Sequence, residues 1–84
     1  MARETAIIIF NVVNKGISVD LEIPTDITAN ELVVALNNAF DLRINMDNIK
    51  KCYLKAEHPI ALLRGNKTLS DYGIRDGSVI NFTE

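Results

Sequence analysis

Hydrophobic and polar positions near the N-terminus alternate with the period of two that is typical of a β-strand. Residues 17–23 alternate without interruption, so four aliphatic side chains point to one side and three polar ones to the other. The preceding segment Asn14-Lys15-Gly16 provides a compact turn, and Pro24 ends the run because it has no N–H to donate to a sheet. Together with residues 5–13, which are rich in β-branched side chains, this pattern predicts an antiparallel hairpin.

The first strand of this hairpin allows two registers, because Ile7-Ile8-Ile9 interrupts the alternation. One register would bury Asn11, whose amide would then need hydrogen-bond partners inside the core. We favour the other register, in which Asn11 is exposed together with Ile7 and Ile9. Its inward-facing residues are Ala6, Ile8, Phe10 and Val12.

An amphipathic helix is predicted to follow the hairpin. Thr28 and Glu31 have the spacing of a capping box, in which each side chain accepts a hydrogen bond from a backbone N–H of the first turn. Ile27 and Leu32 are placed as the two halves of a hydrophobic staple, which fixes the same helix start. Apolar residues at helical spacing then form a stripe that is expected to cover one face of a sheet. The stripe contains Leu32, Ala35, Leu36, Ala39 and Phe40, with Val33 at its margin, while Asn30, Asn37 and Asn38 face water.

The pattern of residues 41–67 is less regular than that of the hairpin and the helix. Leu42, Ile44 and Ile49 are interpreted as apolar anchors of a loop that returns the chain to the sheet. A third strand is predicted over residues 51–55. In this strand Cys52 and Leu54 are expected to point inward and Tyr53 outward. A turn is predicted at His58-Pro59, followed by a fourth strand over residues 60–64.

Residues 68–82 combine a tight polar turn with a terminal strand. Ser70 and Asp71 have side chains that accept hydrogen bonds from nearby backbone N–H groups, which predicts a short helical turn. Leu69 and Ile74 are the apolar ends of that turn. The strand that follows directs Ser78, Ile80 and Phe82 to one side and Val79, Asn81 and Thr83 to the other.

The motif Thr68-Leu69-Ser70-Asp71-Tyr72-x-Ile74 resembles the one that precedes the last strand of ubiquitin. Asp71-Tyr72-Gly73-Ile74-x-Asp76-Gly77 resembles more closely the YukD-like family of small bacterial ubiquitin-like proteins, and its two glycines give the backbone access to positive φ. The order strand-strand-helix-strand-strand-turn-strand agrees with this resemblance. We therefore expect an α+β, β-grasp (ubiquitin-like) fold, with a mixed five-stranded sheet, its first and last strands paired in the middle, and one helix packed across one face.

Composition narrows the classes of function. The 84 residues are 48% hydrophobic and 24% charged, which is typical of one globular domain spanning residues 1–84 with a single core. A formal net charge of -2 with both signs interspersed argues against nucleic-acid binding, which needs a concentrated basic face. Cys52 is the one cysteine in this sequence, so no disulfide within it is possible. No apolar run approaches the ~20 residues that cross a bilayer. The N-terminus lacks the features of a secretory signal, and we expect a cytoplasmic protein without direct membrane insertion.

Candidate catalytic residues are few. The chain has one His and one Cys, and neither has a nucleophile or base partner at a spacing that a known catalytic pair uses. His58 precedes Pro59 and is interpreted as a solvated turn residue. Asp71 and Asp76 are assigned to turns rather than to a pair of catalytic carboxylates. We expect neither an enzyme nor a cofactor or metal site.

The resemblance carries expectations of its own about function. Ubiquitin and the sulfur carriers act through a protruding diglycine tail, whereas this sequence ends in Thr83-Glu84, so conjugation and sulfur transfer are not expected. Membership of the YukD-like family implies an accessory or regulatory role in the type VII secretion apparatus, with cytoplasmic domains of that machine as protein partners. Two alternatives stay open: a small non-catalytic regulatory subunit of a multicomponent oxygenase, and a modifier made from a longer precursor.

The remaining candidate for function is a surface. In the favoured register several residues of the sheet face away from the helix, and a group of apolar side chains on an otherwise solvated face is typical of a partner site. The alternative is that these residues are apolar because strands favour such side chains. The predicted partner-binding residues are Ile7, Ile9, Tyr53, Val79 and Asn81, with Lys55 at the rim beside Lys50 and Lys51.

Overall fold

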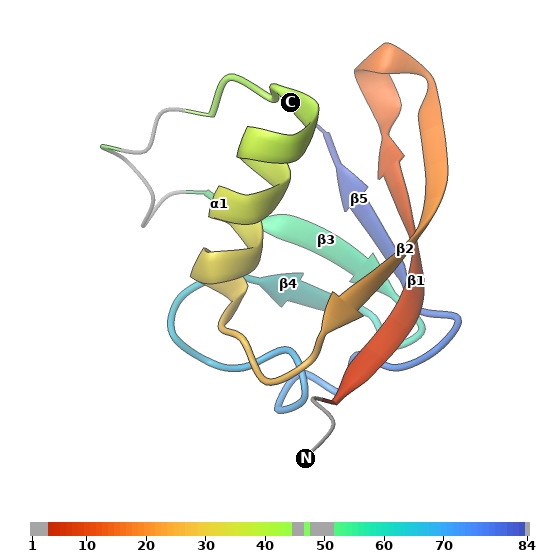
Figure 1. Cartoon of the computed structure of the whole chain (residues 1–84), viewed down its shortest axis with the longest axis vertical. Coiled ribbons are helices and arrows are strands. Elements are labelled where there is room, and N and C mark those ends of the chain that lie inside the picture. Colours follow the sequence, from red (N-terminus) through yellow and green to blue (C-terminus); the bar gives the residue numbers. More distant parts are fainter. Residues whose placement is uncertain (1–3, 45–46, 48–51, 84) are drawn as a thin grey trace.

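The computed structural model describes residues 4–44, 47 and 52–83. Five strands form one sheet in the order β2-β1-β5-β3-β4, and helix α1 lies across one face of it (Figure 1). The strands β1 and β5 pair in parallel, and every other neighbouring pair is antiparallel. The predicted β-grasp architecture is confirmed. The bounds are β1 (Thr5–Val12), the 3₁₀ helix η1 (Val13–Lys15), β2 (Ile17–Pro24), α1 (Ala29–Phe40), β3 (Leu54–Glu57), β4 (Ala61–Leu63) and β5 (Val79–Phe82).

The favoured register of β1 is confirmed. Burial alternates along the strand, so that Ala6, Ile8, Phe10 and Val12 lie in the core while Ile7 and Ile9 are exposed. Asn11 points outward with them but is half-buried rather than exposed, because its amide contacts Asn81. The connection to β2 is a turn of 3₁₀ helix that is capped by Gly16. Gly16 has a φ of 66°, in the left-handed region that costs other residues conformational free energy. In the hairpin Ile8 pairs with Leu21 and Val12 pairs with Ile17.

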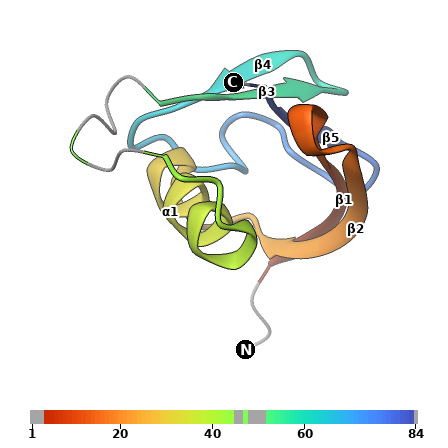
Figure 2. The same cartoon turned by 90° about the horizontal axis from the view of Figure 1, so that it is seen from above.

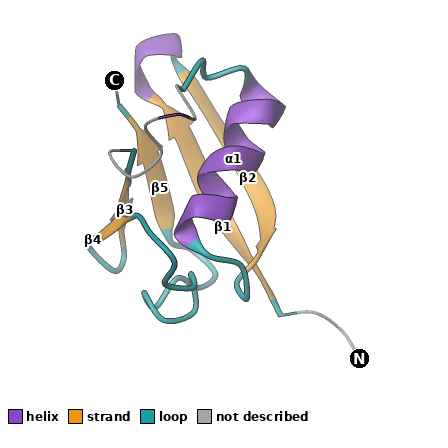
Figure 3. Ribbon diagram, turned by 90° about the vertical axis from the view of Figure 1, so that its left-hand side faces the viewer, coloured by secondary structure: helices purple, strands orange, loops and turns teal. Residues whose placement is uncertain are grey.

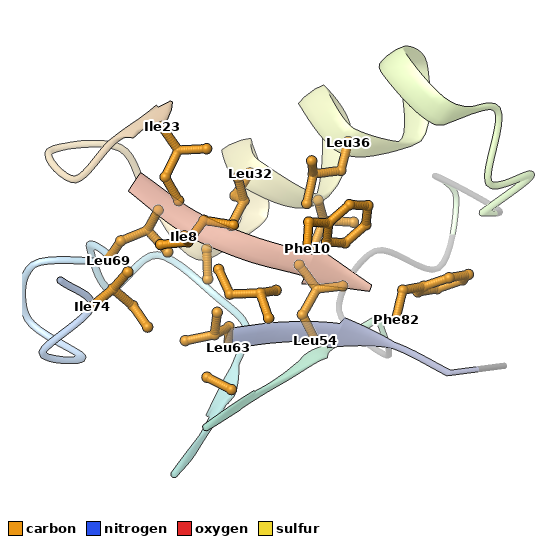
Figure 4. Packing of buried hydrophobic residues seen from close by; sticks show 14 of the residues in the cluster. Ile8, Phe10, Ile23, Leu32, Leu36, Leu54, Leu63, Leu69, Ile74 and Phe82 are labelled. Carbon is orange, nitrogen blue, oxygen red and sulfur yellow. The ribbon is translucent and has the colours of Figure 1, made fainter. Parts of the chain in front are cut away.

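The core fills the space between α1 and the concave side of the sheet, which curves around the helix (Figures 2 and 3). Phe10 lies near its centre (Figure 4) and is fully buried, with its ring 5.1 Å from that of Phe40. A core of this kind supplies most of the stability of a small domain. Its other members include Ile8, Ile23, Leu32, Leu36, Leu54, Leu63, Leu69, Ile74, Ile80 and Phe82.

The predicted apolar stripe of α1 is confirmed at Leu32 and Leu36, which are buried, and is wrong at several of its other positions. Val33, assigned to the margin, is 1% exposed, and Ala29 is fully buried beside it. Ala35 and Ala39, assigned to the core, are exposed, and Phe40 is half-buried. The apolar surface of this helix is wider than the face that the sheet covers, so that spacing alone does not fix its rotation. Leu32, Val33 and Leu36 pack into the core, and the small side chains of Ala35 and Ala39 are left at the margin.

The N-terminus of α1 is tied to a distant part of the chain. The predicted capping box is present, with Thr28 Oγ1 accepting from the N–H of Glu31 at 3.1 Å and Glu31 Oε1 accepting from the N–H of Thr28 at 3.2 Å. The next two free N–H groups, of Ala29 and Asn30, donate to the carbonyls of Lys67 and Gly65. Such groups must find partners outside the helix.

Two Asn residues of the helix do not simply face water, contrary to the prediction. Asn30 is half-buried, and its Oδ1 accepts a hydrogen bond from the N–H of Gly65 at 3.0 Å. Asn37 is also half-buried, and its Oδ1 accepts from the N–H of Ile44 at 2.9 Å. Asn38 is exposed as predicted. Both half-buried amides therefore hold the segments that flank the helix in space.

The third strand starts later than predicted. β3 begins at Leu54 and ends at Glu57, and Ala56 pairs with both Ile80 and Ala61 at the inner face. Ala, Lys and Glu have low strand propensity, which explains why the sequence pattern favoured the segment before them. Cys52 is half-buried, Leu42 is buried and Ile44 is half-buried. Lys51 and Ile49 lie outside the described residues, and the fourth strand is shorter than residues 60–64.

The turn in residues 68–74 is capped by Thr68 rather than by Ser70 or Asp71. Thr68 Oγ1 accepts a hydrogen bond from the N–H of Asp71 at 3.1 Å. Leu69 and Ile74 are buried, as predicted. The N–H groups of Leu69 and Ser70 donate to the carbonyls of Ile27 and Thr25 at 2.9 Å, so that the turn and the segment before α1 support each other.

Asp76 connects the last turn to the first strand. Its Oδ1 accepts a hydrogen bond from the N–H of Ile7 at 2.8 Å, and the N–H of Gly77 donates to the carbonyl of Ile7 at 2.9 Å. We expect Asp76→Ala to lower the free energy of unfolding by about 1 kcal/mol, because the N–H of Ile7 loses its acceptor. Asp76→Asn retains an acceptor oxygen and should cost less than half as much. Urea unfolding measures both, and equal losses would show that Asp76 does not act as this acceptor.

Candidate partner-binding surface

The face of the sheet opposite α1 is called the outer face here. Residues that alternate with the core positions of β1, β5 and β3 point to it, and they include five of the six predicted partner-binding residues. Strand pairing places Ile9 beside Val79 and places Asn81 between Asn11 and Lys55. The five are Ile7, Ile9, Lys55, Val79 and Asn81.

An apolar group, the outer ridge, consists of Ile7, Ile9 and Val79. The side chains of Ile7 and Ile9 are 56% and 37% exposed, and Val79 is half-buried next to Ile9. These residues lie on β1 and β5, two neighbouring interior strands of the sheet that are fixed on both sides by backbone pairing. A partner that covers the ridge would therefore meet side chains that need little ordering on binding.

Asn81 has a structural contact that the sequence pattern did not reveal. Its Oδ1 accepts a hydrogen bond from Asn11 Nδ2 at 2.8 Å, and its Nδ2 donates to Glu57 Oε2 at 3.1 Å. The three side chains form a polar row across β1, β5 and β3. The row stabilises the strand pairing on the outer face and limits the outer ridge on that side.

Beyond this row the outer face is hollowed between β5, β3 and β4. Lys55 and Asn81 line this shallow hollow of about 320 Å³ together with Ile60 and Leu62. Ile60 is 92% exposed and Leu62 is 51% exposed. Sequence reasoning missed both, although alternation around the buried Leu63 provides a signal that Leu62 faces outward.

Tyr53 lies apart from these two groups. It precedes β3, is 46% exposed, and does not line the hollow. Lys50 and Lys51, which were expected beside Lys55 at the rim, lie outside the described residues. Within the described part of the chain, the structure thus brings together an apolar ridge and a mixed hollow, and it leaves Tyr53 in neither, just before β3.

Among residues 4–44, 47 and 52–83, no group of three or more His, Cys, Asp and Glu is arranged to hold a metal ion. His58 is exposed, and its carbonyl accepts a hydrogen bond from Ser78 Oγ at 2.7 Å. No helix in this part of the chain has the length and apolarity needed to cross a membrane.

Comparisons with known proteins place the chain in a family. No curated protein sequence matches it. Among solved structures it is similar to the C-terminal ubiquitin-like domain of mouse tubulin-specific chaperone e, with a TM-score of 0.72 and 12% identity over 100% of this chain and 92% of that one. At that identity the likeness shows the ubiquitin-like fold alone. The family model for protein YukD of the WXG100 protein secretion system (Wss) matches residues 7–81, and the chain therefore belongs to the YukD family.

Proposed function

We propose that this protein is a non-catalytic, non-conjugated binding component of the WXG100 protein secretion system. In this role it contacts another protein of the machine on the cytoplasmic side through the outer face and has an accessory or regulatory effect on secretion. The family match supports the assignment to the system. The observation that supports the binding mode is the outer ridge, where Ile7 and Ile9 are exposed to solvent on β1, an interior strand of the sheet.

The outer face combines exposed apolar side chains with a backbone that is held in place by strand pairing. Water contact with a large aliphatic side chain costs free energy, and a partner removes that cost at about 25 cal/mol for each Å² of apolar surface that it covers. The ridge is small, so the hollow with Ile60 and Leu62 extends the apolar contact on the same face. Lys55 at the edge of the hollow provides a charge that affects partner choice more than affinity.

The two alternative functions considered for this sequence, an oxygenase subunit and a protein modifier, predict different observations. The family match favours a secretion machine over a multicomponent oxygenase. A modifier would be recovered as higher-mass conjugates from cell extract, whereas a binding component is recovered at its own mass together with intact partners.

Substitution at Ile9 tests the proposed face. Ile9→Asp would place a carboxylate opposite Asp20, its cross-strand partner, and would cost stability as well as binding. Ile9→Lys places a favourable charge pair at the same position and is the better probe. We expect Ile9→Lys to weaken binding to cytoplasmic domains of the secretion machine at least about tenfold, as loss of a central anchor does. Tyr53→Ala, made separately, tests the predicted contact that lies outside the ridge and the hollow.

The matched control is Asn38→Lys, which adds the same charge on the exposed side of α1. Co-purification from membranes of the native host, followed by titration against each cytoplasmic domain recovered, gives the readout. Unchanged binding by Ile9→Lys, with the control also unchanged, would reject the outer face as the site.

A further inference from the structure

Charge is divided unevenly along this chain. Residues 16–42, which contain β2 and α1, include five acidic residues and no Lys or Arg, so all nine basic residues lie elsewhere. The net charge of -2 hides this division. The charged residues within β2 and α1 themselves, Asp20, Glu22 and Glu31, are therefore all acidic, although the whole protein is close to neutral. The flanking basic residues Lys15 and Arg43 contact Asp41, at the other end of α1 from Glu31.

The same two elements enclose an apolar groove. Its floor and walls include Leu21 and Ile23 of β2 and the small side chains of Ala35 and Ala39 of α1, and its volume is about 500 Å³. Ala35 and Ala39 are the residues that the helical spacing assigned to the core and that the structure leaves exposed. Because they are small, they leave room between the helix and the strand.

The groove runs beside an open edge of the sheet. The strand β2 is at one end of the strand order, and no strand in the described part of the chain pairs with its other side. An edge of this kind has backbone N–H and C=O groups that can pair with an added strand. Its inward side chains Ile17, Val19 and Leu21 are only half-buried, in contrast to those of β1.

We propose that the groove and the β2 edge form a second binding site, separate from the outer face, for an extended segment of another protein. The segment pairs with β2 and places alternate apolar side chains between β2 and α1, as in strand addition to other sheets. It has Lys or Arg next to its apolar residues, because the charged residues that line the groove are Glu22 and Glu31 and none of the lining residues is basic. Opposite charge selects the partner and accelerates encounter.

A pair of synthetic heptapeptides tests the proposal. In the first, two Arg residues precede alternating Val and Ser; in the second, two Glu residues replace the Arg residues. We expect titration of the ¹⁵N-labelled full chain with the basic peptide to shift amide signals of residues 17–24 and of Ala35 and Ala39. The acidic peptide should bind at least about tenfold more weakly, and the difference should shrink in 1 M salt.

Matched substitutions locate the contact. Ala39→Gln fills the groove without adding charge, and Asn38→Gln places the same side chain at the neighbouring exposed position, outside the groove lining. The first should weaken binding of the basic peptide at least about tenfold, and the second less than about twofold. Equal binding of the two peptides, no shift at 1 mM peptide, shifts that centre on Ile9 and Leu62, or an Ala39→Gln variant that binds normally would each overturn the proposal. Shifts at β2 that depend on protein concentration without peptide would make a second copy the occupant and would also overturn it.

Discussion

Phe10→Ala is expected to lower the free energy of unfolding by about 3–5 kcal/mol, which is much of the 5–15 kcal/mol typical of a native domain. Phe10 is fully buried at the centre of the core, and its ring packs against that of Phe40. Its backbone also belongs to the strand that pairs with both β2 and β5, so that the surrounding structure has little freedom to close the cavity. Urea unfolding followed by circular dichroism measures the change.

The control for this substitution is Ile7→Ala on the same strand. Ile7 is 56% exposed, so its truncation should cost less than about 1 kcal/mol, mainly through strand propensity. A Phe10→Ala variant as stable as Ile7→Ala would mean that the core is not centred on Phe10.

Leu69→Ala is expected to cost about 2–5 kcal/mol, the second largest loss. Leu69 is fully buried, its N–H donates to the carbonyl of Ile27, and its own carbonyl accepts from the N–H groups of Tyr72 and Ile74. Loss of its side chain removes the apolar contact that holds the closing turn against the segment before α1. We therefore expect faster amide exchange at Ala29 and Asn30, whose N–H groups donate to Lys67 and Gly65.

Ser70→Ala is the matched control for Leu69→Ala. Ser70 is exposed, and the hydrogen bond of its backbone to Thr25 does not need the side chain. Ser70→Ala should change the free energy of unfolding by no more than about 0.5 kcal/mol. A Leu69 variant that loses stability with unchanged exchange at the start of α1 would contradict the link between the turn and the helix.

Much of this fold was predictable from sequence because local signals agreed with one another. The uninterrupted alternation of residues 17–23, the spacing of Thr28 and Glu31, and the glycines at positions 73 and 77 each specify a local structure without reference to the rest of the chain. The structure has those elements at those places, including positive φ at both glycines.

The features that sequence reasoning missed depend on contacts between distant residues. The rotation of α1 is set by how the sheet fits its side chains, and spacing allows both Val33 and Ala35 as inward positions. The start of β3 is set by its pairing with β5 and β4, which overrides the low strand propensity of Lys55, Ala56 and Glu57.

The candidate surface was predicted only in part, because some of its contacts also join residues that are distant in the sequence. Alternation along β1 and β5 identified Ile7, Ile9 and Val79 as outward residues, and the structure places them together. The alternation pattern did not show that Asn81 is held between Asn11 and Glu57, since that contact joins three strands. The hollow with Ile60 and Leu62 was missed because it requires knowledge of which strand lies beside β3.

Photocrosslinking in living cells tests the central claim most directly. A photoreactive amino acid at position 9 lies on the outer ridge, and one at position 38 lies on the exposed side of α1 as the reference. The proposed function predicts that irradiation joins the position 9 variant to a component of the WXG100 secretion machine, identified by mass spectrometry, and that the position 38 variant gives no such product. Equal products from both positions, or a product from position 38 alone, would contradict it.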